Sequence, residues 1–140
     1  MTLRPLVFCL GFVQLAAMGC GGGAPGRAGA SPTPCTDHLQ PADPSAVLPA
    51  DLPAAAGQTV YDRATQGATT VWFAHAPGAD VVAARDELSA QFAAAGYNDL
   101  VEDAEPPAEA ELQFEGVHNG SIQVTPLCAG HLRLRYRVSK

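Results

Sequence analysis

The stretch DVVAARDELSAQFAAAG, residues 80–96, decides the fold because its pattern predicts one amphipathic helix. Its apolar residues recur at intervals of three and four positions, which draws a single stripe along about four helical turns. Asp80 can cap the first turn through its carboxylate, and Gly96 is suited to end the last turn. A helix with one apolar stripe needs a second layer to bury it. The stripe consists of Val81, Ala84, Leu88, Phe92 and Ala95.

Strand-like segments on both sides of this helix supply that layer. Residues 58–64 and 69–75 are rich in β-branched and aromatic side chains and flank the turn Gln66-Gly67, which predicts a hairpin. After the helix, residues 97–101 read as a returning strand and residues 102–107 as a polar loop. The remaining predicted strands are residues 110–115, 121–125 and 131–138, all with alternating apolar and polar residues.

The pattern predicts an α+β fold in two layers. One amphipathic helix would pack on an antiparallel, curved sheet of about five to six strands. For the hairpin between residues 110–115 and 121–125, a two-residue turn would place apolar opposite polar residues. We therefore predict the three-residue loop 118–120, which pairs Phe114 with Val124 and Gly116 with Ile122.

The first nineteen residues predict an export signal. A basic start, an apolar run of about a dozen residues and a small-residue end follow in the typical order, and the run is shorter than the roughly 20 residues of a membrane span.

The segment Ala17-Met18-Gly19-Cys20 resembles the lipobox of bacterial lipoproteins. The resemblance implies cleavage before Cys20 and diacylglycerol on its thiol. The alternative is an ordinary secretory signal, cut near Ala17 or Gly19, and a secreted domain without lipid.

Three regions follow from this interpretation. Residues 1–19 would be the signal peptide, residues 20–57 a flexible, disordered tether rich in Gly, Ala and Pro, and residues 58–140 the α+β domain. Within the tether we expect at most a short turn near residues 45–48. The overall layout resembles small helix-on-sheet domains of exported lipoproteins, and that resemblance identifies no activity.

The four cysteines support the same interpretation. Cys9 would leave with the signal and Cys20 would take the lipid, which leaves Cys35 and Cys128 with one possible pairing. Export would place this pair where disulfides persist. A bridge across more than 90 residues would stabilise the fold by about 4–5 kcal/mol in the chain-entropy model. The alternative is two unpaired, buried thiols.

The sequence predicts no catalytic residue, cofactor site or metal site. The formal charge of −6 disfavours nucleic acid as a partner. No Ser or Cys lies beside a base in a recognisable motif. His118 and His131 would lie at opposite ends of one strand, roughly 20 Å apart, so they cannot share an ion.

The arginine row of the last predicted strand, Arg133, Arg135 and Arg137, has two interpretations. It could contact a polyanion, acidic lipid headgroups or a partner protein, or it could be a solvated strand face neutralised by Glu111 and Glu115. We favour the structural interpretation.

The predicted function is that of a non-catalytic binding or interaction module. The protein would be exported and anchored by lipid on Cys20 to a bacterial membrane, facing the periplasm or the exterior, with an envelope protein or polymer as partner. The alternative is a small-ligand carrier or enzyme with a pocket between the helix and the sheet, beside Leu88 and Phe92.

Overall fold

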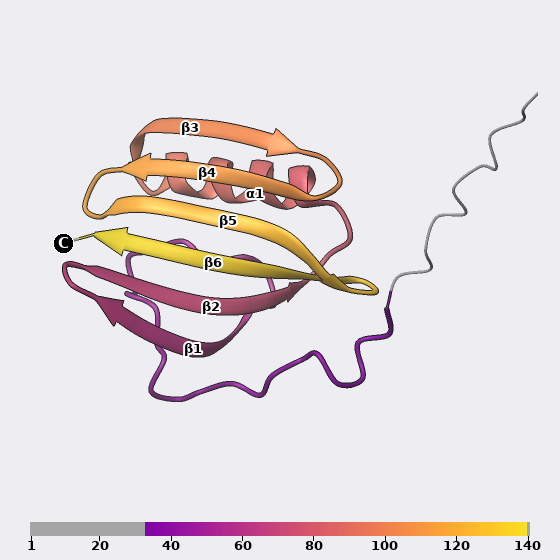
Figure 1. The fold of residues 1–140 in the computed structure, drawn as a ribbon. Coiled ribbons are helices and arrows are strands. Elements are labelled where there is room, and N and C mark those ends of the chain that lie inside the picture. The colour runs from indigo at the N-terminus through magenta and orange to yellow at the C-terminus, as the bar shows by residue number, and fades with distance from the viewer. Residues whose placement is uncertain (1–32, 140) are drawn as a thin grey trace, which may run out of the picture. The chain divides into compact units, whose positions relative to one another are not determined.

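The computed structural model describes residues 33–139 (Figure 1). The predicted signal peptide, the lipid attachment residue Cys20 and the first part of the predicted tether lie outside these residues. The described elements are β1 (Thr59–Gln66), β2 (Thr69–Pro77), α1 (Val81–Ala94), β3 (Asn98–Glu105), β4 (Glu109–Glu115), β5 (Asn119–Cys128) and β6 (His131–Ser139).

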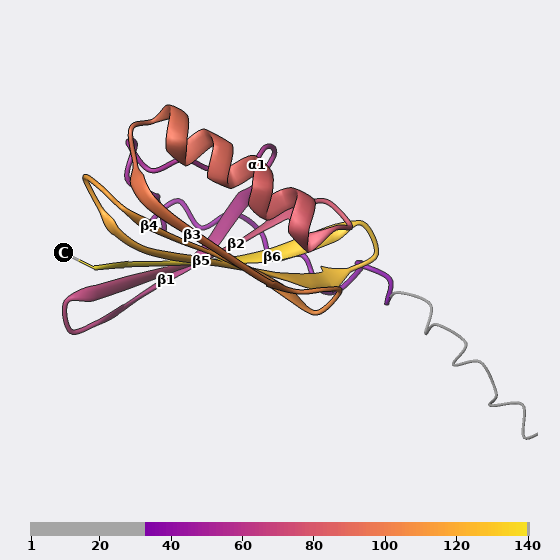
Figure 2. The same ribbon diagram turned by 90° about the horizontal axis from the view of Figure 1, so that it is seen from above.

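The six strands form one open antiparallel sheet in the order β1-β2-β6-β5-β4-β3. Helix α1 lies on one face of this sheet, against β3, β4 and β5 (Figure 2). Asp80 caps the helix as predicted, because its carboxylate accepts hydrogen bonds from the backbone nitrogens of Val82 and Ala83. The expectation of an α+β fold with one helix on an antiparallel sheet is thus confirmed.

The helix covers only part of the sheet, and an irregular segment covers more of it. We call residues 33–57 the strap; it is the purple segment of Figure 1. Ala46 and Leu52 of the strap are buried, and Leu52 belongs to the same core as Phe92 of the helix. The backbone oxygen of Val47 accepts a 3.0 Å hydrogen bond from the indole nitrogen of Trp72 on β2.

The strap wraps around the edge of the sheet. Its Gln40 carbonyl accepts a hydrogen bond from the ring of His75, which points away from the helix. Its Val47 carbonyl accepts one from Trp72, which points into the core on the other face. Between these contacts the Asp43 nitrogen donates to the Val60 oxygen on edge strand β1. Residues 33–57 were predicted as part of a flexible tether; instead they pack on the domain, because their apolar side chains complete its core.

Strand β3 is longer than predicted. Residues 102–105, expected in a polar loop, continue the strand, and Glu102 and Asp103 pair with β4. Acidic side chains suit this position because β3 is an edge strand and its side chains reach solvent. The Arg85 guanidinium of α1 also holds the strand, donating a 2.9 Å hydrogen bond to the Asp103 carbonyl oxygen.

The register of the β4–β5 hairpin differs from the prediction. The loop has the expected three residues, but it spans residues 116–118, two positions earlier than predicted. As a result Phe114 pairs with Gly120 and Leu112 with Ile122. The predicted pairs of Phe114 with Val124 and Gly116 with Ile122 are therefore wrong. The apolar residues still share one face, because the shift is an even number of residues.

The lack of a side chain at Gly120 explains this register. A Cβ atom there would overlap the backbone oxygen of Arg137 on β6 and would lie 3.0 Å from the ring of Phe114. Gly116 is similarly confined, since a Cβ atom would lie 2.8 Å from Tyr97. The two glycines thus allow close packing around the Phe114 ring, which is 1% exposed.

Candidate functional site: the open face of the sheet

The face of the sheet that points away from α1 carries most of the polar side chains of the central strands. We call it the open face (Figure 2). Alternation along each strand assigns its residues, since their neighbours form the core beneath the helix. It includes Val71, Phe73 and His75 on β2, His131, Arg133, Arg135 and Arg137 on β6, Ser121, Gln123 and Thr125 on β5, and Glu109, Glu111 and Gln113 on β4.

The arginine row lies near the middle of this face. Strand β5 separates it from β4, and Arg135 pairs with Gln123, which in turn pairs with Glu111. Two interstrand spacings, about 9–10 Å, therefore lie between the Arg135 and Glu111 backbones. Within residues 33–139 no ion pair within 4.0 Å involves Arg133, Arg135 or Arg137. The expected ion pairs of these arginines with Glu111 and Glu115 are therefore not formed.

Arg135 is held by an aromatic ring. Its guanidinium carbon lies 5.9 Å from the centroid of the Phe73 ring, within range of a cation–π interaction. Its Nε atom is buried and makes no hydrogen bond to the described part of the chain. Arg133 and Arg137, on either side, are exposed. The row therefore consists of one supported guanidinium between two that reach into solvent.

Acidic side chains gather two strands away from the arginines. Asp103, Glu105, Glu109 and Glu111 surround a small hollow of about 90 Å³ on β3 and β4. Glu109 accepts a 2.7 Å hydrogen bond from the Gln123 side chain of β5. The open face is thus polarised, with cationic groups along β6 and anionic groups at the β3 edge.

A wider pocket lies between the strap and the sheet, beyond the Arg133 end of the row. It measures about 470 Å³ and opens to solvent. Tyr61 in its wall stacks on the His75 ring, with centroids 5.9 Å apart, and the Nε2 nitrogen of His75 donates to the Gln40 carbonyl at 2.8 Å. The lining residues are Asp37, His38, Gln40, Tyr61, Asp62, Leu127 and Arg133.

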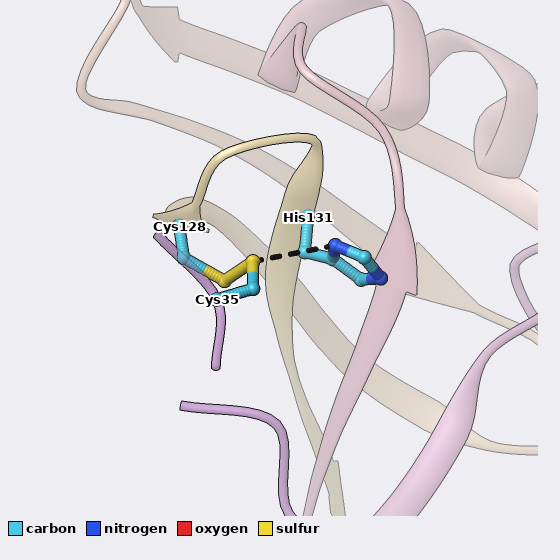
Figure 3. A group of neighbouring side chains, drawn as sticks. All are labelled: Cys35, Cys128 and His131. Atoms are coloured by element: carbon cyan, nitrogen blue, oxygen red, sulfur yellow. Dashed lines mark hydrogen bonds between the residues drawn. A yellow bond between two sulfur atoms is a disulfide. The ribbon is translucent and has the colours of Figure 1, made fainter. Parts of the chain in front are cut away.

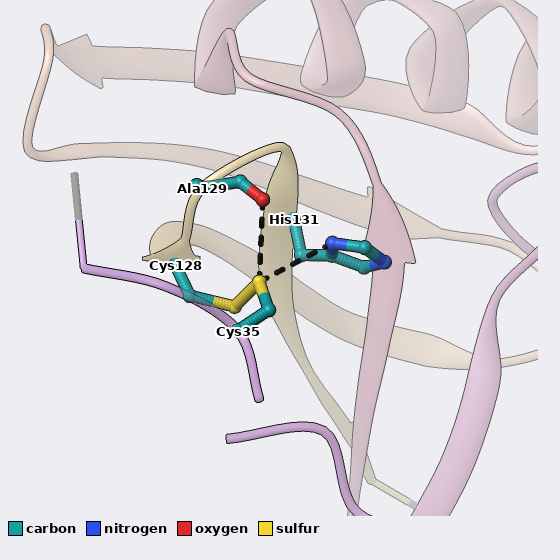
Figure 4. The surroundings of a disulfide bond; sticks show 4 residues. All are labelled: Cys35, Cys128, Ala129 and His131. Atoms are coloured by element: carbon teal, nitrogen blue, oxygen red, sulfur yellow. Dashed lines mark hydrogen bonds between the residues drawn. A yellow bond between two sulfur atoms is a disulfide. The ribbon is translucent and has the colours of Figure 1, made fainter. Parts of the chain in front are cut away.

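A disulfide joins the strap to the β5–β6 hairpin. It links Cys35 to Cys128, the pairing expected from the cysteine count (Figure 3). The Nδ1 nitrogen of His131 lies 3.4 Å from the Cys35 sulfur, and because a disulfide sulfur carries no proton, the ring nitrogen is the donor. The Ala129 carbonyl oxygen lies 3.2 Å from the same sulfur (Figure 4).

The histidine at the other end of β5 has a different role. His118, in the β4–β5 loop, contacts the Asp51 carboxylate of the strap at 3.0 Å. The hydrogen bond from His118 lowers the pKa of Asp51 below its ordinary value. His118 and His131 lie at opposite ends of β5, as predicted.

The space between helix and sheet is filled by side chains. Leu88 and Phe92 are fully buried, and the Phe92 ring lies 4.5 Å from that of Phe114 and 4.8 Å from that of Tyr97. A hollow of about 60 Å³ remains beside Leu88. Pockets for small molecules typically measure about 300–1,000 Å³. This geometry favours a surface as the functional site over the alternative of a pocket under the helix.

Sequence reasoning missed one feature of this region. Cys128 and His131 are separated by two residues, and the hairpin pairs them across its turn. The Cys-x-x-His spacing was the signal in the sequence that could have indicated this feature, and Cys35 and His38 have the same spacing. Only the folded chain brings Cys35 to Cys128 and His131.

Comparison of the chain with protein-family models, with curated proteins and with solved structures finds no match. In the described part of the chain, α1 has 14 residues, and no helix there is long and apolar enough to cross a membrane.

Proposed function

We propose that this chain is an exported bacterial envelope protein, anchored by lipid on Cys20, and that its folded part is a non-catalytic binding module for an anionic polymer. The sequence Ala17-Met18-Gly19-Cys20 supports the anchor. The disulfide between Cys35 and Cys128 supports export, because such bonds persist in oxidising compartments.

The row of three arginines without ion-pair partners within residues 33–139 is the observation that carries the proposed binding function. Alternate residues of a strand lie about 6.7 Å apart, so Arg133, Arg135 and Arg137 span about 13 Å. Such a row suits a chain of repeated anionic groups better than a single anion. The acidic hollow at the β3 edge repels the same polymer and thereby favours its alignment along β6.

The proposed anchor would keep this surface close to a membrane. Residues 21–32 separate Cys20 from the strap, and a fully extended chain of that length reaches about 40–45 Å. The polymer bound by the open face would therefore lie in the layer next to the bilayer.

We expect Cys20→Ser to move the protein from the membrane fraction to the soluble fraction. Removing the thiol removes the acyl chains, each buried methylene of which contributes about 0.8 kcal/mol to membrane binding. Fractionation by immunoblot and intact mass of the native protein test this expectation. A Cys9→Ser variant is the matched control and should remain with the membrane. A soluble wild-type protein without an acyl mass would refute the anchor and support the secreted alternative.

We expect replacement of Arg133 and Arg137 by glutamine to weaken binding of the purified protein to inorganic polyphosphate about tenfold or more. Hydrogen bonds to charged groups contribute about 1.5–3 kcal/mol each, and each lost phosphate contact also lowers the salt dependence of binding. Titration at several salt concentrations measures both quantities.

Arg63→Gln is the matched control for this measurement, because Arg63 is an exposed arginine of edge strand β1. It should leave the affinity for polyphosphate nearly unchanged. An equal loss in the control, or no binding by the wild-type protein, would contradict the assignment of the arginine row.

A further inference from the structure

We propose that Cys35, Cys128 and His131 form a binding site for a thiophilic divalent metal ion, such as Zn²⁺, when the disulfide is reduced. The two sulfur atoms and one ring nitrogen all lie within 4.8 Å of one another (Figure 3). This inference goes beyond the proposed binding of polyanions and does not depend on it.

The distances match those of a tetrahedral zinc site. Zinc binds sulfur at about 2.3 Å and imidazole nitrogen at about 2.0–2.1 Å, which places such ligands about 3.6 Å apart. The Cys35 sulfur and the His131 Nδ1 nitrogen are already 3.4 Å apart. The two sulfurs need only separate to about 3.8 Å after the bond between them breaks.

Two of the three ligands come from one tight turn. Cys128 ends β5, His131 begins β6, and the register pairs them across Ala129-Gly130. Gly130 adopts a φ of 72°, which suits glycine in such a turn, and its carbonyl oxygen accepts a 2.9 Å hydrogen bond from Gly78. The hairpin therefore holds this pair of ligands whether or not the disulfide is present.

The third ligand is held in place by the strap on both sides of Cys35. The Thr33 carbonyl accepts a 2.9 Å hydrogen bond from the Ala129 nitrogen, and the Gln40 carbonyl accepts one from His75. The Ala129 carbonyl, 3.2 Å from the Cys35 sulfur, can accept a hydrogen bond from the thiol once it forms. These contacts keep Cys35 near the hairpin after reduction.

The redox state determines whether the site can bind a metal. A dithiol that reduces the bond becomes a disulfide itself and passes two electrons and two protons to Cys35 and Cys128. The proton of His131 then lies on Nε2, and the metal ion displaces the two thiol protons and binds Nδ1 of the neutral imidazole, since thiolate and neutral imidazole are the metal-binding forms. In the oxidised protein neither sulfur is a thiolate, so only His131 remains as a ligand.

The full-length protein with Cys9→Ser and Cys20→Ser, which keeps only the two proposed thiol ligands, tests the inference by titration with Co²⁺. It is first reduced with a phosphine under nitrogen and then freed of the phosphine. We expect one equivalent to produce thiolate-to-cobalt charge-transfer absorption and the intense visible bands of tetrahedral Co²⁺, and Zn²⁺ to abolish them. The oxidised protein should show neither signal. Absence of charge-transfer absorption in this reduced protein would overturn the proposal.

Variants identify the ligands. Cys35→Ser and Cys128→Ser each leave one thiolate, so each should at least halve the charge-transfer absorption. His131→Ala keeps both cysteines, and it should weaken Zn²⁺ binding at least tenfold in competition with a chelator, because even indirect partners of metal ligands contribute about 10–100-fold. His118→Ala, at the other end of β5, is the matched control. Equal affinities of the two histidine variants would exclude His131 and refute the site.

Discussion

Replacement of both Cys35 and Cys128 by serine is expected to lower the free energy of unfolding by about 4–5 kcal/mol. The bond links residues 93 positions apart, so its loss frees nearly the whole described chain in the unfolded state. The effect is large compared with the 5–15 kcal/mol that stabilises a typical domain. Urea denaturation of the wild-type and doubly substituted proteins measures it.

Two controls separate the bond from other effects of the cysteines. Reduced wild-type protein, kept with a metal chelator, should lose about the same stability as the double variant. Serine substitution at Cys20, which lies outside the disulfide, should leave the free energy of unfolding unchanged. A loss below about 1 kcal/mol in both the double variant and the reduced protein would show that the bond does not constrain the fold.

Phe92→Ala is expected to destabilise the protein by about 3–5 kcal/mol. The ring is fully buried and contacts Phe114 and Tyr97, which come from β4 and from the segment after the helix. Its removal leaves a cavity between the layers and removes an aromatic cluster that attaches α1 to the sheet. Thermal and urea denaturation, analysed together, give the change in stability.

Phe73→Ala provides the matched control, because Phe73 lies half-buried on the open face, next to Arg135. It should cost clearly less stability than Phe92→Ala, since less apolar surface is buried there. If the two variants lost equal stability, the assignment of the core to the helix side of the sheet would be wrong.

The strap connects the fold, the proposed function and the inferred metal site. Its residues 46–52 complete the core, its Gln40 carbonyl orients His75, and its Cys35 reaches the β5–β6 hairpin. Reduction of the disulfide therefore changes the attachment of a segment that borders the open face. Under the proposed anchor, this segment would also be the first part of the folded domain that follows the lipid-bearing Cys20 in the sequence.

Local sequence patterns predicted the type of nearly every element. The helix followed from the three- and four-residue spacing of its apolar residues, and Asp80 was recognisable as its cap. The arginine row was predicted on one face of its strand, because alternation along a strand depends only on neighbouring residues. The pairing of Cys35 with Cys128 could be stated because the interpretation of the first twenty residues left only these two cysteines.

Tertiary structure decided what depends on residues far apart in the chain. The hairpin register was set by close contact of Gly120 with β6, which no pattern within residues 110–125 reveals. The separation of the arginines from Glu111 followed from the position of β5 between them. The strap likewise packs through contacts between residues 25 to 67 positions apart, and Cys35 approaches His131 across 96 positions. Periodicity reports only which face of its own element a residue occupies.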